Sequence, residues 1–265
     1  MKFLNYKNKF SLDNKVVFVT GGCGLLGKEI CIAFATTGAK TIILDINDNI
    51  GKTLCNELCN ENYDVHYEHF DVTDLNDIEN KILILNEKYK KIDVWVNSAY
   101  PRTNDWSNNV ENLNLDSWKK NIDMHLNSYS WISKTVALIM KNQNSGNIIN
   151  FGSIYGVKSP DFSVYAGTDL TCPMAYSAIK GGIINLTRYL ASYFGKYNVR
   201  INSICPGGIL NGQNEIFLKN YECKVPLKRL GKPDEVASVV LFLASEASSY
   251  ISGNTLMVDG GWSII

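Results

Sequence analysis

Short apolar runs alternate with segments of helical periodicity along this chain, and this alternation constrains the fold more than any other feature. The first run, residues 15–20 (KVVFVT), is rich in β-branched side chains, and a glycine-rich turn and a helical pattern at residues 25–37 follow it. Strands that alternate with helices at this spacing need crossover connections, which predict a parallel sheet covered by helices on both faces. The expected fold class is therefore α/β, with a doubly wound parallel sheet.

The remaining elements follow the same order. Further strands are expected at residues 40–45, 65–70, 92–97, 146–151, 199–204 and 255–259, and further helices at residues 47–60, 75–89, 115–141, 176–194 and 233–244. Pro233 suits the start of its helix, because the first helical residue donates no hydrogen bond within the helix. The chain has 265 residues, no internal repeat and no linker rich in Pro, Gly or Ser, so we expect a single domain over residues 1–265.

Charge and hydropathy exclude several classes of protein. Lys and Arg number 26 and Asp and Glu also number 26, and no basic stripe with interleaved aromatic residues occurs, which argues against a nucleic-acid partner. The N-terminal segment (MKFLNYKNKFSLDNK) has no apolar run long enough for a signal peptide. No stretch approaches the ~20 apolar residues of a membrane span. We expect a cytoplasmic protein without a membrane partner.

The cysteines argue against a metal or a disulfide framework. There are seven, an odd number, scattered without a C-x-x-C pair, and the chain has only three histidines. Reduced thiols in a cytosolic protein are expected, and no metal site is predicted.

Tyr176 and Lys180 lie at the start of the helix predicted at residues 176–194. Because they are four positions apart, both side chains project from one face of the helix. A free tyrosine, with a pKa near ~10, exchanges protons poorly at neutral pH, but a neighbouring ammonium stabilises the phenolate and lowers that pKa. The pair is a candidate proton-transfer device; the alternative is an ordinary solvated helix face.

A glycine-rich turn, residues 20–27 (TGGCGLLG), joins the first strand to the first helix. Glycines at this place let the backbone approach a pyrophosphate, and the helix N-terminus offers free N–H groups and the positive end of its dipole. Strand, turn and helix together predict a dinucleotide site, with a tight turn that binds nothing as the alternative.

Asp45 ends the second predicted strand. A carboxylate there accepts hydrogen bonds from the adenosine ribose hydroxyls and repels a 2′-phosphate. Residues 21–26 and 46–47 contain no Arg or Lys, so the sequence favours NAD, with NADP the weaker candidate. The alternative for Asp45 is a capping or turn residue.

Several spaced motifs resemble those of the short-chain dehydrogenase/reductase family in its single-domain, Rossmann-type form. They are TGGCGLLG at Thr20, DVTD at Asp71, NSAY at Asn97, NIINFGSIYG at Asn147, YSAIK at Tyr176, VRINSICPGG at Val199 and the closing run from GKPDEVASVVLFLAS to VDGG. The resemblance extends from about residue 15 to the end. It implies an NAD(P)-dependent oxidoreductase that transfers hydride between nicotinamide and a carbon bearing an alcohol or ketone.

The resemblance also implies roles for individual residues. Tyr176 matches the general acid/base, Lys180 its pKa partner and ribose ligand, and Ser153 the serine that hydrogen-bonds the reacting oxygen. The cofactor-binding residues expected from the turn and the resemblance are Thr20, Gly21, Gly22, Gly24, Leu25, Leu26, Gly27, Asp45, Asp71, Val72, Asn97, Ser98, Ala99, Tyr176, Lys180, Pro206, Gly207 and Ile209.

Two single residues depart from the family pattern. Leu25 stands where a glycine is usual, so the phosphate contacts of the turn are expected to differ in detail. His125 stands in the place of an asparagine that belongs to the family's proton relay. An imidazole, with a pKa near ~6.5, also passes protons, so His125 is a candidate catalytic residue. The alternative is a histidine that only packs inside the helix.

The segment before Tyr176 is longer than is common in the family. Ser153 and Tyr176 are 23 positions apart, and we expect the extra residues, an insertion at about 157–175, to shape the substrate pocket. Tyr165 within it is a rival for the catalytic tyrosine, but Asp169 and not a lysine lies four residues on. A surface loop without substrate contact is the alternative. Residues 208–226 are expected to form a substrate lid.

The substrate expected is a small hydroxylated molecule. The insertion is rich in polar and aromatic residues, and together with Arg102 it suits a sugar or nucleotide sugar better than a sterol or a fatty acyl chain. The segments SIYGV and AYSAIKGGI resemble the flagellin-modification and surface-sugar branch of the family, which implies carbohydrate biosynthesis. Two alternatives remain: an epimerase or dehydratase that recycles its bound NAD, and a cofactor-binding protein of this fold without catalysis.

The resemblance further implies a homo-oligomer, a dimer or a tetramer. Relatives commonly pack the long helices predicted at residues 115–141 and 176–194 against those of a second copy.

Overall fold

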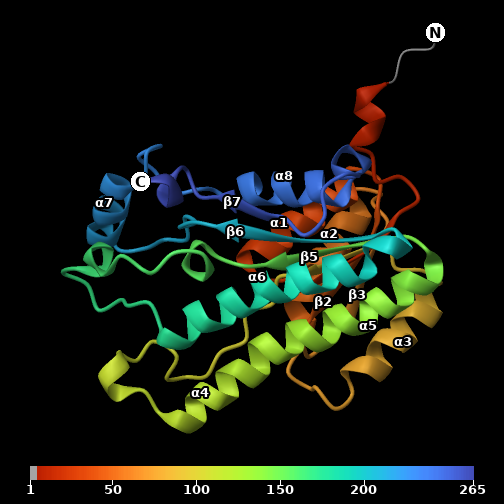
Figure 1. Cartoon of the computed structure of the whole chain (residues 1–265). Helices are drawn as coiled ribbons and strands as arrows, with labels where there is room; N and C mark the ends of the chain where they lie inside the picture. The colour runs from red at the N-terminus through yellow and green to blue at the C-terminus, as the bar shows by residue number, and fades with distance from the viewer. Residues whose placement is uncertain (1–4) are drawn as a thin grey trace.

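The centre of the fold is a seven-stranded sheet in which all neighbouring strands are parallel, with the order β3-β2-β1-β4-β5-β6-β7 (Figure 1). The computed structural model describes residues 5–265. The strands are β1 (Val16–Thr20), β2 (Lys40–Asp45), β3 (Val65–His69), β4 (Val94–Asn97), β5 (Gly146–Phe151), β6 (Val199–Pro206) and β7 (Thr255–Val258). The predicted doubly wound α/β fold is confirmed.

Helices cover both faces of this sheet (Figure 1). On one side lie α1 (Leu25–Thr36), α2 (Asp48–Asn60) and α8 (Pro233–Ala244); on the other lie α3 (Ile78–Tyr89), α5 (Ser128–Gln143) and α6 (Met174–Phe194). Apolar side chains of the two layers form two clusters, with fully buried Phe34 in one and Ile82 in the other. Each fully buried side chain of this size contributes roughly 1.5–3 kcal/mol to stability.

The strand register brings the carboxyl ends of the central strands together. Thr20 of β1 pairs with Asn97 of β4, and Asn97 pairs with Asn150 of β5. In a doubly wound sheet, ligands bind outside the carboxyl ends of the strands where the strand order reverses. The reversal here lies between β1 and β4, so it predicts the place of the site.

The long helix expected at residues 115–141 is divided. It consists of α4 (Leu115–Asn121), a π-helical segment η3 (Ile122–Asn127) and α5. A π-helical segment holds an extra residue within a turn and commonly marks a functional site. The apolar spacing of the sequence did not reveal it, because one irregular turn hardly disturbs the periodicity over 29 residues. His125 lies within this segment.

The lid expected at residues 208–226 contains a helix that the sequence analysis missed, α7 (Glu215–Lys224). The Asn214 side chain caps its N-terminus by accepting from the Ile216 N–H, and the helix buries only Phe217 and Tyr221. With so few apolar positions among Asn, Lys and Glu, the sequence of this segment resembles that of a loop. Other boundaries differ by a few residues; α3 begins at Ile78 and α6 at Met174.

No helix within residues 5–265 has the length and apolar character needed to cross a bilayer. Over the same residues, no group of three or more His, Cys, Asp or Glu side chains is arranged to hold a metal ion.

Candidate active site

A cavity of about 790 Å³ opens at the carboxyl edge of the sheet. Fifteen of the expected cofactor residues lie on its wall: Gly21, Gly24, Leu25, Leu26, Gly27, Asp45, Asp71, Val72, Ser98, Ala99, Tyr176, Lys180, Pro206, Gly207 and Ile209. Thr20, Gly22 and Asn97 do not line it. The folded chain thus brings together Asp45 and residues from five separate sequence motifs in one site.

The turn after β1 is compact because glycines permit close approach. Gly21 has φ +67°, and a Cβ atom there would lie 2.7 Å from the Cα of Ala99. A Cβ on Gly27 would lie 2.0 Å from the Gly21 carbonyl oxygen. Gly24 is the N-cap of α1, and Leu25 is its first residue, with its side chain on the cavity wall. The leucine in place of the usual glycine therefore leaves the junction of turn and helix intact.

Thr20 and Asn97 lie directly behind the cavity wall, where both are fully buried. Thr20 Oγ1 accepts from the Ser98 N–H at 3.2 Å. The Asn97 side chain accepts from Trp95 Nε1 and donates to Asn150 Oδ1. These bonds join β1, β4 and β5 and hold the ends of the strands in place.

Asp45 is presented at one end of the cavity with its carboxylate oriented by the backbone. Its Oδ2 accepts from the Cys23 N–H at 3.0 Å, and its Oδ1 accepts from the Asn47 N–H at 2.9 Å. Asp71, the other carboxylate on the wall, accepts from the N–H and hydroxyl of Thr73. This end of the site carries negative charge and no lining cation.

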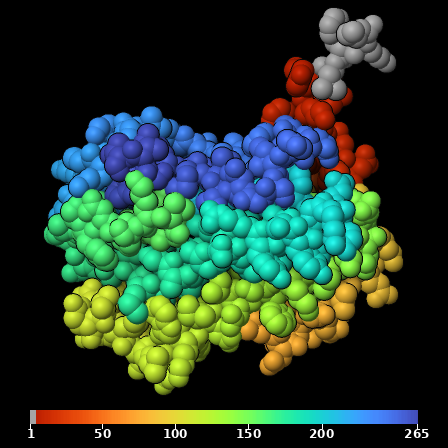
Figure 2. All heavy atoms as spheres, in the orientation of Figure 1, coloured from red at the N-terminus to blue at the C-terminus, as the bar shows by residue number. Residues whose placement is uncertain are grey.

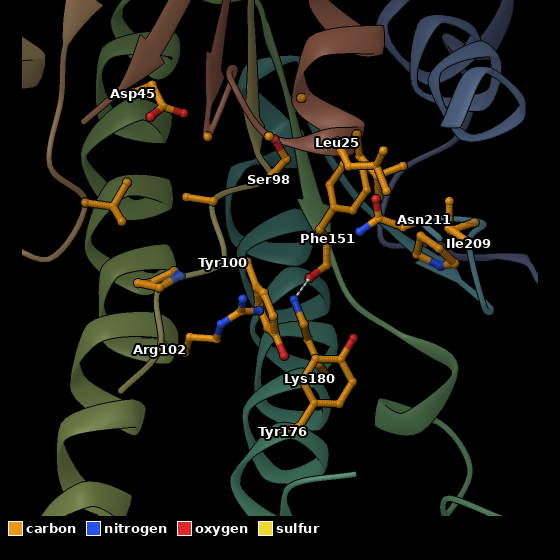
Figure 3. Close-up of a pocket in the computed structure, with 18 of the residues that line it drawn as sticks. Leu25, Asp45, Ser98, Tyr100, Arg102, Phe151, Tyr176, Lys180, Ile209 and Asn211 are labelled. Carbon is orange, nitrogen blue, oxygen red and sulfur yellow. Dashed lines mark hydrogen bonds between the residues drawn. The ribbon is translucent and has the colours of Figure 1, made fainter. Parts of the chain in front are cut away.

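Tyr176 and Lys180 share one face of α6, as predicted, and both line the cavity at the end away from Asp45 (Figure 3). Lys180 Nζ donates to the Phe151 carbonyl oxygen at 2.7 Å and lies 3.2 Å from His125 Nε2. It also lies 5.7 Å from the centre of the Tyr176 ring. Only 4% of Lys180 is exposed, so its amine is held by these neighbours and not by bulk water.

Burial governs the titration of this pair. Desolvation lowers the pKa of Lys180 to about 7. Desolvation also raises the pKa of Tyr176, and the neighbouring Ser153 hydroxyl opposes that rise. From the sequence we expected Lys180 to lower the pKa of Tyr176. In the free protein the loss of hydration outweighs any such effect, because burial disfavours the charged form of each group.

Ser153 lies between β5 and α6, close to the tyrosine. It is buried and caps the short 3₁₀ helix η4 (Ile154–Gly156), where its Oγ accepts from the Tyr155 N–H at 3.2 Å. Its hydroxyl proton remains available to a second acceptor.

Two aromatic residues beside Tyr176 were not predicted. The rings of Tyr100 and Trp106 both meet the Tyr176 ring edge to face, at 5.9 Å and 6.2 Å between centres. Trp106 Nε1 donates to the Tyr100 hydroxyl at 2.8 Å. Desolvation raises the pKa of Tyr100 to about 12. Tyr100 stands in the NSAY motif, whereas nothing in the sequence around Trp106 distinguishes it from other residues of an irregular loop.

The insertion at 157–175 packs on α7 and on the C-terminal segment, and in Figure 2 its green surface adjoins their blue surface. Tyr165 stacks on Phe217 at 5.7 Å, and Asn220 Nδ2 donates to the carbonyl oxygens of Val164 and Ala166. The Tyr165 hydroxyl bonds to that of Tyr155, and Tyr165 does not line the cavity. This rival tyrosine is therefore placed to support the pocket, not to face it.

His125 is fully buried beside Lys180. Burial first, and then the charge of Lys180, lowers its pKa well below the usual value, so the imidazole is neutral. Its Nδ1 has no hydrogen-bond partner within residues 5–265.

We predict that His125→Asn keeps substantial turnover and that kcat of His125→Ala falls at least ~10-fold. The amide oxygen of asparagine can replace the acceptor that faces Lys180, whereas the methyl group of alanine cannot. Steady-state rates and the pH profile of kcat for both variants check this. The profile should shift only in the alanine variant. Equal rates for the wild type and His125→Ala would remove the relay hypothesis.

A glycine turn at a helix N-terminus, an acidic residue at the end of β2 and a half-buried Tyr beside a buried Lys define a dinucleotide-binding enzyme of the α/β class. A family model described as enoyl-(acyl carrier protein) reductase matches residues 25–263. The chain is 34% identical to post-translational flagellin modification protein A of Campylobacter coli, covering 96% of this chain and 100% of that protein. It is also 34% identical to 7alpha-hydroxysteroid dehydrogenase of Bacteroides fragilis, covering 97% and 96%.

Among solved structures, a short chain dehydrogenase from Leptospira borgpetersenii with bound NAD+ is similar. It is 31% identical, with a TM-score of 0.83 and coverage of 99% of this chain and 97% of that one. This chain belongs to the short-chain dehydrogenase/reductase family and is an NAD(P)-dependent oxidoreductase.

Proposed function

We propose that this protein interconverts an alcohol and a ketone on a small hydroxylated substrate with NAD(H), and that Tyr176 is its general acid/base. The observation that carries the proposal is the pair of Tyr176 and Lys180 on the cavity wall, at the end away from Asp45, with the buried Ser153 hydroxyl beside Tyr176. Ser153 donates a hydrogen bond to the substrate oxygen, and Tyr176 exchanges a proton with it. Lys180 holds the nicotinamide ribose and stabilises the phenolate.

The remaining wall residues bind the cofactor. The turn at Gly21, Gly24 and Gly27 leaves room for the pyrophosphate beside the N-terminus of α1, and Asp45 accepts from the adenosine ribose. Bound nicotinamide supplies the acceptor or donor of hydride. The protein's contribution is to orient the substrate, to exclude water and to manage the proton.

The preference for NAD rests on Asp45. Its carboxylate repels a 2′-phosphate, and the lining residues around it include no cation. We expect Asp45→Ser to reduce the preference for NADH over NADPH at least ~10-fold, because the variant lacks the charged group that hydrogen-bonds the ribose and repels a 2′-phosphate. Fluorescence titration with both reduced cofactors measures this, with Asp116→Asn, an exposed carboxylate of α4, as the control. Wild-type protein that binds NADPH as well as NADH would contradict the proposal.

The relatives do not choose the substrate, since a hydroxysteroid dehydrogenase and a flagellin modification protein are equally similar. The polar lining outside the Asp45 and Asp71 end (Arg102, Asn211, Gln213) favours a sugar or another polyol. A screen of alcohols, polyols, sugars, nucleotide sugars and hydroxysteroids with NAD, followed at the absorbance band of NADH, tests this. A stoichiometric rise supports net oxidation; product without net NADH indicates an epimerase or dehydratase that recycles its cofactor. No reaction, with NAD still bound, indicates a binding protein without catalysis.

We also propose a homo-oligomer. Large apolar side chains are exposed on α5 and α6, namely Trp131, Leu138, Tyr189 and Tyr193. An unpartnered face of this kind commonly marks a protein interface. Light scattering after size exclusion measures the stoichiometry, and a monomer at micromolar concentration would contradict the proposal.

A further inference from the structure

Arg102 is a cation on the cavity wall that has no ionic partner among residues 5–265. It lies five residues beyond the end of β4, and its side chain is exposed towards the cavity. Its guanidinium carbon lies 5.2 Å from the centre of the Tyr100 ring. No carboxylate of residues 5–265 forms a salt bridge with it. Asp105, the carboxylate of the same loop, instead accepts from the Ser117 hydroxyl at 2.6 Å.

The other three arginines are used by the protein itself. Arg229 forms a bidentate ion pair with Glu235, and Arg188 donates to Thr255. Arg200 donates to backbone carbonyl oxygens of Leu243, Ser245 and Ile251. Of the four arginines, only Arg102 lines the cavity, and its guanidinium lies over the Tyr100 ring. A guanidinium has five N–H donors, more than a contact with one phenol uses.

The charges of the cavity are divided between its two ends. The two lining carboxylates are Asp45, which ends β2, and Asp71, which follows β3; both strands lie on the opposite side of β1 from β4 and β5. Arg102 lies with Tyr100, Tyr176 and Lys180 at the other end (Figure 3). Tyr100 separates the guanidinium from the Tyr176 ring, 5.9 Å beyond it. A molecule of several carbon atoms that reacts at Tyr176 therefore reaches Arg102 with its opposite end.

We propose that Arg102 binds an anionic group of the substrate, a carboxylate or a phosphate, at the end remote from the reacting carbon. The proposal rests on the function proposed above and narrows its substrate class to hydroxylated acids or sugar phosphates. A planar guanidinium matches two oxygens of either group with a pair of charge-assisted hydrogen bonds. Packing against Tyr100 orients the guanidinium beforehand, so that less conformational entropy is lost on binding.

The test uses three probes of similar length: D-glucitol, D-gluconate and D-glucitol 6-phosphate. Calorimetry measures their binding to the complex of the full-length protein with NADH, and absorbance measures their oxidation with NAD. We expect at least one of the two anions to bind and to react better than glucitol. Arg102→Gln should raise the Kd of that anion and lower its kcat/KM, each at least ~10-fold. The same variant should keep the Kd of NADH and the values for glucitol within twofold of the wild type. Whichever anion responds identifies the group as carboxylate or phosphate. Arg188→Gln, a substitution of an arginine outside the cavity, is the matched control and should change neither.

The outcomes separate this inference from the proposed function. Anion binding that depends on Arg102, without any oxidation, keeps the anion site and contradicts the oxidoreductase proposal for these alcohols. The anion site is overturned if neither anion binds better than glucitol, or if Arg102→Gln and Arg188→Gln behave alike. It is also overturned if Arg102→Gln weakens the binding of NADH and leaves the binding of the anions unchanged, because the guanidinium would then bind the cofactor phosphates.

Discussion

Tyr176→Phe is expected to lower kcat at least ~10³-fold while the Kd for NADH stays within a few-fold of the wild type. A general acid/base contributes about 10²–10⁴-fold, and phenylalanine removes only the oxygen that would exchange the proton. The ring keeps its edge-to-face contacts with Tyr100 and Trp106, so the fold and the cofactor site should survive. Stopped assays of NADH formation with saturating substrate, together with fluorescence titration of NADH, measure the two quantities.

Tyr165→Phe is the matched control for this prediction. It removes a phenolic oxygen from a tyrosine that lies on the insertion, bonds to Tyr155 and does not line the cavity. We expect it to keep turnover within a few-fold. If instead Tyr165→Phe were the inactive variant, the assignment of the acid/base to Tyr176 would be wrong. If neither variant lost activity, proton transfer by either of these two tyrosines would be excluded.

Lys180→Met should produce the second large effect, a loss of roughly 10²–10⁴-fold in turnover accompanied by weaker NADH binding. Within residues 5–265, the buried amine is the only cation in contact with the Tyr176 ring, and it contacts both the Phe151 carbonyl oxygen and His125. Without it, no charge stabilises the phenolate, and only the hydrogen bond from the Ser153 hydroxyl still lowers the pKa of Tyr176. Lys120→Met, on the exposed surface of α4, is the control. Unchanged turnover in Lys180→Met would contradict the role given to the lysine.

Lys180 also makes the stability of the free protein depend on pH in a direction that can be worked out. Its pKa falls from 10.5 to about 7 on folding because the amine is desolvated. Between these pH values the unfolded chain binds a proton that the folded chain does not, so this lysine destabilises the fold increasingly as the pH falls from 10.5 towards 7. The slope is at most about 1.4 kcal/mol per pH unit.

Denaturant titrations of the wild type and Lys180→Met at pH 7, 8 and 9 isolate this contribution, because the other titrating groups are common to both proteins. The free energy of unfolding of the wild type, relative to that of the variant, should rise with pH. A difference that is constant across this range would mean that Lys180 keeps an ordinary pKa in the folded protein.

The sheet and its cofactor end were predictable from the sequence because their signals are local. Apolar runs such as KVVFVT must be buried on both faces, and a glycine turn between strand and helix has few other uses. The spacing of Tyr176 and Lys180 on a helix likewise depends only on helical geometry. Each of these predictions required no knowledge of distant residues.

The predictions that failed depend on what surrounds a residue. The sequence predicted that Lys180 lies beside Tyr176, but it did not predict that Lys180 is buried. Burial lowers the pKa of Lys180 and raises that of Tyr176, so that both groups favour their neutral forms. The Trp106 ring contacts that of Tyr176 although the two residues are far apart in the chain. The π-helical turn at His125 and the helix α7 were missed because neither has a distinct periodicity of its own.

By itself, then, the sequence determined the order of strands and helices, the dinucleotide turn, the acidic residue after β2 and the pair on α6, since each follows from residue types at fixed spacing. Only the tertiary structure decided which groups share the far end of the cavity. In the fold, Arg102 lies against Tyr100 and not against a carboxylate, and Tyr165 does not lie on the cavity wall. Those contacts form between segments joined by the fold, and their distances cannot be obtained from the order of residues along the chain.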